Sequence, residues 1–146
     1  MKTTLLYSLI IFALASCSVC GGDDDDPIVT NIKETCPTAT FMNHDQLDTL
    51  QNGDFHLIGF RYDNVDQNLK LDIGINGCSF ERDFNLLISN AESKSMPPQR
   101  VAKLVFEEQF CDAAFSGTIC FDVSQLNKPT VLKLETRSGT QSVRIE

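Results

Sequence analysis

Alternation of apolar and polar residues is the main pattern of the chain after about residue 50. In residues 69–75 every second residue is Leu or Ile, and the residues between them are Lys, Asp and Gly. Successive side chains of a β-strand point to opposite faces, so this pattern predicts a strand with one buried face. The same reasoning predicts strands at residues 54–62, 69–75, 80–88, 100–106, 117–123, 130–136 and 141–145.

Turn-forming Gly, Asn, Pro and Ser residues separate these strands, and no long helical period is present. Residues 43–50 predict one short helical turn, in which Asn43 caps the first turn and Leu47 faces inward. Short strands at intervals of about 10–15 residues indicate an antiparallel β-sandwich or barrel. We expect an all-β fold, an antiparallel sandwich of about seven strands within residues 28–146, with residues 28–40 irregular.

A second apolar pattern lies at the N-terminus, where residues 5–15 are almost wholly apolar and follow Lys2. A run of about eleven residues suits the core of an export signal and is shorter than the roughly 20 residues that span a bilayer. It ends in Leu14-Ala15-Ser16-Cys17, which resembles the lipobox of bacterial lipoproteins. The resemblance implies a signal peptide at residues 1–16 and a lipid anchor on Cys17 that attaches the protein to a membrane. The alternatives are an ordinary secretory signal and an uncleaved membrane anchor.

Residues 17–27 have the composition of a flexible tether, because glycines and four consecutive Asp residues, 23–26, cannot bury apolar area. An acidic block just after a lipidated Cys also resembles the surface-export signal of Bacteroidetes-type lipoproteins. That resemblance implies an outer-membrane protein that faces the cell surface. The simpler interpretation is a solvated spacer. Residues 28–146 then form a single β-domain.

Charge excludes one class of partner. Residues 27–146 hold 16 acidic and 11 basic side chains, without a basic cluster. A mildly acidic domain of this kind is repelled by phosphate backbones, so we expect no nucleic-acid partner. No cofactor motif is present either.

Four cysteines remain in the β-domain, and an even number in an exported protein predicts two disulfides. Three pairings are possible. Cys78 and Cys111 each follow a strand end, where a cross-link between sheets is sterically easy, so we expect this pair. Cys36 and Cys120 are then left to tie the irregular N-terminal segment to a core strand. The spacing lacks the paired Cys-x-x-Cys motif of a zinc site, and we expect no metal.

Several short motifs resemble a family of uncharacterised exported bacterial β-domains. They are Gly77-Cys78, Phe84-Asn85-Leu86-Leu87, Pro97-Pro98-Gln99, Leu104-Val105 and Phe121-Asp122-Val123-Ser124. The family tends to have His after the Gly-Cys and Leu-Val motifs, where this chain has Arg82 and Phe106 nearby. The resemblance implies an exported β-domain, and no activity comes with it.

Catalytic groups are scarce. His44 precedes the strands, and His56 alternates with Ile58, Phe60 and Tyr62 on what should be one face of the first strand, which favours a half-buried structural His. Neither lies in a nucleophile motif. Adjacent strand residues point to opposite faces, so Glu107 and Glu108 cannot flank one glycosidic bond. Calcium binding by Asp63, Asp66 and Asn68 lacks the required ligand pattern.

These observations predict a lipid-anchored, non-enzymatic binding or accessory module of the cell envelope, whose partner is an unidentified envelope protein or glycan. The alternative is an envelope hydrolase or metal-dependent enzyme that uses His56 and nearby carboxylates. Recognition is expected in the polar loops at residues 63–68 and 90–99, because loops on a rigid sandwich usually carry binding.

Overall fold

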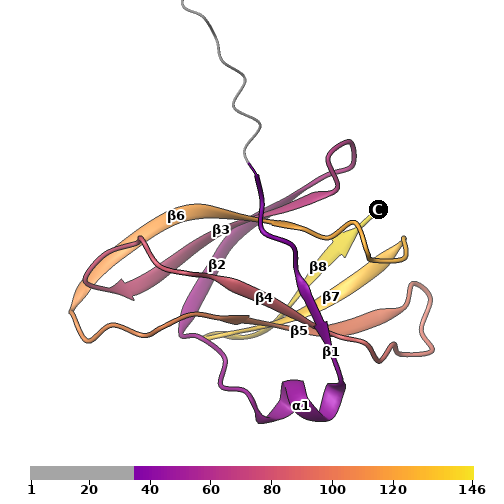
Figure 1. Ribbon diagram of the computed structural model, residues 1–146, viewed down its shortest axis with the longest axis horizontal. Helices are drawn as coiled ribbons and strands as arrows, with labels where there is room; N and C mark the ends of the chain where they lie inside the picture. Colours follow the sequence, from indigo (N-terminus) through magenta and orange to yellow (C-terminus); the bar gives the residue numbers. More distant parts are fainter. Residues whose placement is uncertain (1–34) are drawn as a thin grey trace, which may run out of the picture. The chain divides into compact units, whose positions relative to one another are not determined.

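The computed structural model describes residues 35–146, which form two β-sheets and one short helix (Figure 1). One sheet has three strands in the order β2-β3-β6. These are β2 (Phe55–Asp63), β3 (Asn68–Gly77) and β6 (Ala113–Asp122), and both pairs are antiparallel. The predicted signal peptide, Cys17 and the acidic tether lie outside the described residues.

The other sheet has five strands in the order β1-β4-β5-β7-β8. Their bounds are β1 (Thr40–Met42), β4 (Asn85–Ser89), β5 (Gln99–Val105), β7 (Thr130–Thr136) and β8 (Gly139–Ile145). The predicted β-sandwich is therefore confirmed, and the sheets do not close into a barrel.

Two features of the five-stranded sheet differ from the prediction. The pairs β1·β4 and β5·β7 are parallel. Between β5 and β7 the chain passes through β6 in the other sheet, so it returns in the same direction. Strand β1 lies in the segment expected to be irregular, because three residues are too few to show an alternating pattern.

The alternation seen in the sequence produces the core. Along β3 the residues Leu69, Leu71, Ile73 and Ile75 are at most 3% exposed, and the residues between them are partly accessible. They join apolar residues of the five-stranded sheet in one buried cluster, which includes Leu86, Ile88, Ala102, Leu104, Leu132, Leu134, Val143 and Ile145. Burial of these side chains is the main stabilising contribution to the sandwich.

Strand β2 corrects the expected placement of His56. The pairing with β3 shifts between Leu57 and Gly59, which is typical of a β-bulge. As a result Phe60 and Tyr62 lie opposite buried leucines of β3, whereas His56 lies opposite Gly74 and is exposed. The four alternating residues therefore do not share one face, and the expected half-buried position of His56 is wrong.

The predicted strand at residues 80–88 is correct only in its second half, because β4 begins at Asn85. Residues 80–84 form a loop whose aromatic side chains still pack against the core. Strand β6 is longer than predicted and begins four residues earlier, at Ala113.

Helix α1 (His44–Thr49) confirms the predicted helical turn. The Asn43 side chain accepts a hydrogen bond of 3.1 Å from the backbone N–H of Asp45, as an N-cap residue does. Leu47 is fully buried and attaches the helix to the sandwich.

Both expected disulfides are present. Cys36–Cys120 and Cys78–Cys111 have Cα separations of 5.2 Å and 5.0 Å. Next to the first, the backbone N–H of Ala39 donates to the carbonyl of Asp122, and the N–H of Asp122 donates to the carbonyl of Pro37, so residues 36–39 are tied to β6 as predicted.

Candidate functional site

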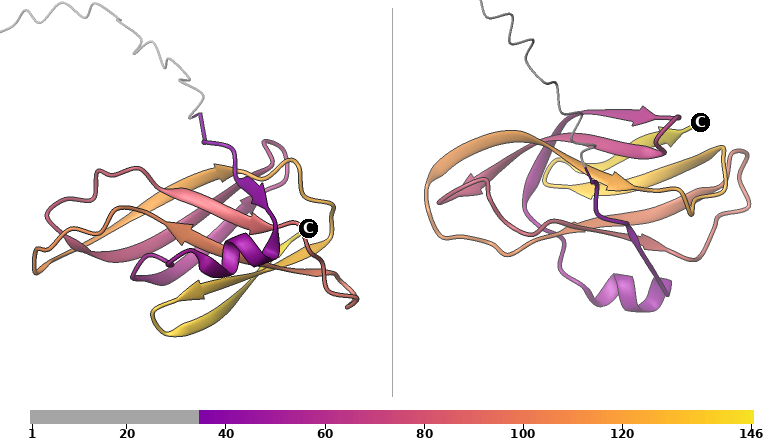
Figure 2. Two further views of the ribbon diagram at one scale, coloured as in Figure 1. Left: turned by 60° about the horizontal axis from the view of Figure 1, so that its bottom comes forward. Right: turned by 45° about the horizontal axis from the view of Figure 1, so that its top comes forward.

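Connecting loops gather at two ends of the sandwich (Figures 1 and 2). Residues 78–84 and 106–112, which cross from one sheet to the other, lie together at the left of Figure 1, and we call them the stapled end. Residues 63–68 and 90–98, which close the β2–β3 and β4–β5 hairpins, lie toward the right, and we call them the hairpin end. The hairpin end is where the sequence predicts recognition.

A covalent bond and a side-chain amide join the two loops of the stapled end. The Cys78–Cys111 disulfide links them directly. Beside it, Oε1 of Gln109 accepts hydrogen bonds from the backbone N–H groups of Cys78, at 2.9 Å, and Ser79, at 3.0 Å. These contacts fix the relative positions of the loops.

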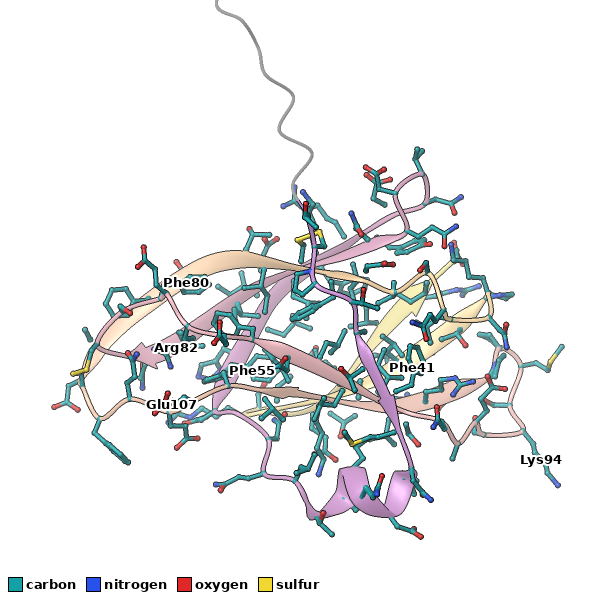
Figure 3. All side chains as sticks on the ribbon, viewed as in Figure 1. Phe41, Phe55, Phe80, Arg82, Lys94 and Glu107 are labelled. Atoms are coloured by element: carbon teal, nitrogen blue, oxygen red, sulfur yellow. A yellow bond between two sulfur atoms is a disulfide. The ribbon has the colours of Figure 1, made fainter. Side chains whose placement is uncertain are left out.

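Arg82 completes this link and is labelled in Figure 3. Its Nη2 donates to the carbonyl of Ser79 at 2.6 Å and to Oε1 of Gln109 at 3.1 Å, and its Nη1 donates to the carbonyl of Glu107 at 3.3 Å. The guanidinium lies over the ring of Phe106, 5.4 Å from its centroid. A Cβ atom at Gly77 would collide with Nη2, so a side chain at that position would displace the guanidinium.

Aromatic rings pack between these loops and the core. The centroid of Phe84 lies 5.5 Å from that of Phe80 and 5.2 Å from that of Phe106. Phe106 also makes an edge contact with the buried ring of Phe55. The Phe80 ring lies against Gly117, where any side chain would displace it. The stapled end therefore rests on a packed aromatic layer.

Two pockets open at the stapled end, one of about 780 Å³ and one of about 470 Å³. Arg82, Asp83 and Asn85 line both. The larger pocket is lined by Val105 and Phe106 and by the carboxylate residues Glu81, Asp83 and Glu107. The smaller one extends toward the Cys36–Cys120 disulfide and Ile119.

The surface of the stapled end combines one apolar side chain with many acidic ones. Phe110 is 99% exposed, and it lies between Gln109 and Cys111 in the cross-linked loop. The two loops contain five acidic residues and one basic residue, Arg82. None of the five carboxylates makes an ion pair or a hydrogen bond to the described part of the chain: Glu81, Asp83, Glu107, Glu108 and Asp112.

Carboxylates elsewhere in residues 35–146 are mostly engaged. Their partners are basic side chains or nearby N–H and O–H groups. The engaged side chains include Asp48, Asp54, Asp63, Asp72, Glu92, Asp122, Glu135 and Glu146. The unpaired carboxylates are thus concentrated at the stapled end.

The hairpin end is organised by local hydrogen bonds without a cross-link. The Asp63 carboxylate accepts from the backbone N–H of Val65 at 2.9 Å. Arg100 donates to the carbonyls of Ser89 and Asn90 and pairs with Glu92. The apolar side chains Val65 and Met96 are 91% and 96% exposed, one on each loop.

Residues weighed for catalysis do not assemble. His44 lies on α1, 3.7 Å from Asp48, and His56 is exposed on the outer face of the three-stranded sheet. Glu107 and Glu108 are exposed in the loop after β5. Within residues 35–146 no group of three or more His, Cys, Asp or Glu side chains is arranged to hold a metal. The helix in that part of the chain is too short and too polar to cross a membrane.

The sequence draws attention to only part of this site. Cys78 and Cys111 are expected there, and Arg82 and Phe106 are noticed as departures from a family pattern. The structure stacks those two residues on each other. Gln109 and Phe110 are missed. Their one signal is an aromatic residue beside a cysteine in an otherwise polar loop.

Comparisons with known proteins give information on the fold and not on the function. No family model and no curated protein matches the chain. A protein of unknown function, DUF1344, from Bacteroides vulgatus matches 76% of this chain and 57% of its own at 11% identity, with a TM-score of 0.54. A candidate toxin-related protein from Parabacteroides distasonis matches 75% of this chain and 58% of its own at 13% identity, also with a TM-score of 0.54. This chain spans somewhat more than half the length of these two Bacteroidetes proteins.

Proposed function

We propose that the protein is a lipid-anchored, non-enzymatic binding module of the bacterial cell envelope, and that it binds its partner through the stapled end. One observation carries the binding role. A fully exposed Phe110 lies on a loop held by a disulfide, Gln109 and Arg82, and its neighbour Gln109 lines a pocket of about 780 Å³. A rigid loop loses little conformational entropy on association, and aromatic side chains often dominate interface energies.

The anchor and the location rest on the sequence. Leu14-Ala15-Ser16-Cys17 supports lipidation of Cys17, and the four Asp residues at 23–26 support transfer to the outer surface of the outer membrane. Two disulfides in the domain suit an oxidising compartment. The fold shared with two Bacteroidetes proteins suits the same setting.

Labelling with a palmitate analogue tests the anchor. The wild-type chain should incorporate label, and Cys17→Ser should remain an unlabelled precursor. Replacing residues 23–26 with Ala should leave labelling intact and protect the protein from protease added to whole cells. Label on Cys17→Ser would contradict the anchor, and unchanged digestion of the Ala variant would reduce the acidic run to a spacer.

Capture from envelope extracts tests the binding role. Immobilised wild-type protein should retain a defined envelope component that Phe110→Ser does not retain. Met96→Ser is the matched control, because it removes an equally exposed apolar side chain from the hairpin end. Loss of capture with Met96→Ser and not with Phe110→Ser would move the binding surface to the hairpin end.

A further inference from the structure

We propose that the partner of the stapled end is a polypeptide segment that carries Lys or Arg side chains next to an apolar one. This inference rests on the proposed function and names the chemistry of the partner. It starts from the pocket that Val105 and Phe106 line together with three carboxylates, and from the exposed Phe110 on one of the two loops that form this pocket.

Shape and charge together select a cationic side chain for the pocket. Lys and Arg combine an apolar stem with a charged tip, and they commonly lay the stem on apolar surface. In the pocket the stem would contact Val105 and Phe106, while the tip would lie among Glu81, Asp83 and Glu107, which line the same pocket. Phe110 supplies a second, apolar contact on the same cross-linked loop.

The unpaired carboxylates give this surface a charge that the free protein does not neutralise. Five acidic side chains on two short loops repel one another, and no basic side chain of the described chain pairs with them. Repulsion of this kind disfavours the free protein slightly and is relieved when a partner brings positive charge. The Cys78–Cys111 bond holds the loops together against this repulsion.

The same charges argue against an anionic partner. Arg82 is the one cation of the two loops, and its guanidinium is engaged by the carbonyls of Ser79 and Glu107 and by Gln109. A phosphate or an anionic lipid headgroup would be repelled by five carboxylates, and the one guanidinium among them already binds protein groups. Nucleic acid and anionic membrane surfaces are therefore disfavoured.

A defined probe tests the proposal without a known partner. The probe is a short fluorescein-labelled peptide of alternating Lys and Leu, compared with one peptide that has Glu in place of Lys and another that has Ser in place of Leu. Fluorescence anisotropy gives the Kd of each peptide for the purified domain at low and physiological ionic strength. Three variants are compared with the wild type: Phe110→Ser, the control Met96→Ser, and a five-amide variant with Glu81→Gln, Asp83→Asn, Glu107→Gln, Glu108→Gln and Asp112→Asn.

The Lys–Leu peptide should bind saturably and lose affinity as salt increases. The five-amide variant and Phe110→Ser should each weaken binding by about tenfold or more, while Met96→Ser stays within about twofold. Both companion peptides should bind more weakly than the Lys–Leu peptide. Absence of saturable binding, equal binding of the Glu peptide, or unchanged affinity in the five-amide variant would overturn the inference.

The proposed function can survive that failure. If Phe110→Ser abolishes capture from envelope extracts but the five-amide variant keeps it, the stapled end binds a partner that is not basic. If neither variant changes capture, the stapled end itself is excluded.

Discussion

The two ends of the sandwich each use a part-buried arginine to hold loop backbone, but they differ in what accompanies it. Arg100 at the hairpin end binds the carbonyls of Ser89 and Asn90 and is neutralised by Glu92. Arg82 at the stapled end also binds two carbonyls, yet it has Phe106 and Gln109 as neighbours in place of a carboxylate.

The difference concerns which carboxylates have partners within the protein. At the hairpin end the carboxylates of Asp63 and Glu92 have partners within the described chain. At the stapled end a disulfide, an amide and a ring supply the stability, so the carboxylates remain unpaired at the surface. The cross-link thus holds together two loops whose like charges repel each other, and hydrogen bonds alone would resist this repulsion less firmly.

Removing the cross-link should give the largest effect. The double substitution Cys78→Ala and Cys111→Ala opens a loop whose ends are 33 residues apart in the sequence. Because the unfolded chain gains conformational entropy, the free energy of unfolding should fall by about 4 kcal/mol. Ser93→Ala, which removes a hydroxyl that accepts from the backbone N–H of Gln99 at the hairpin end, should cost about 1 kcal/mol. Urea unfolding under non-reducing conditions measures both. Equal losses would show that the two ends do not differ in how they are held.

The two arginines give a more direct comparison. Arg82→Gln and Arg100→Gln should each lower the free energy of unfolding by about 2 kcal/mol. Each substitution removes a charged donor and leaves backbone carbonyls without a hydrogen bond. Urea unfolding again provides the measurement. A stable Arg82→Gln protein beside a destabilised Arg100→Gln protein would mean that Arg82 is not structural, and its guanidinium would then be available to a ligand.

Removing carboxylate charges should give the smallest change in the free energy of unfolding, and the change should differ in sign between the two ends. The five-amide variant of the stapled end should unfold with an unchanged or slightly higher free energy, within about 0.5 kcal/mol, because it removes repulsion and breaks no contact. Glu92→Gln should lower it by up to about 1 kcal/mol, because it removes the partner of Arg100. Destabilisation of the five-amide variant would show that its carboxylates have structural partners.

Much of the fold follows from local pattern. The leucines and isoleucines of β3 are buried as their alternation predicts, and Asn43 caps α1 as its position suggests. The Cys78–Cys111 disulfide follows from the position of both cysteines just past strand ends, and Cys36–Cys120 is then the pair that remains.

The failures have non-local causes. The bulge at Leu57 and Gly59 depends on pairing with β3, so the sequence of β2 alone could not place His56 on the outer face. Residues 80–84 alternate like a strand but form a loop, because Arg82 bonds to backbone groups of two loops far apart in the sequence. The site itself depends on Gln109 meeting residues 30 positions earlier, which no local pattern reveals.

The Cys36–Cys120 bond would have a mechanical consequence for the lipid-anchored, partner-bound protein that we propose. A load applied between the N-terminal tether and a partner bound at Phe110 would enter the domain at Cys36 and cross the disulfide to Cys120. From there it would follow the backbone of β6 to Cys111 and Phe110. Every link in that path is covalent, so tension need not separate any pair of strands, and helix α1 and strand β1 would carry no force.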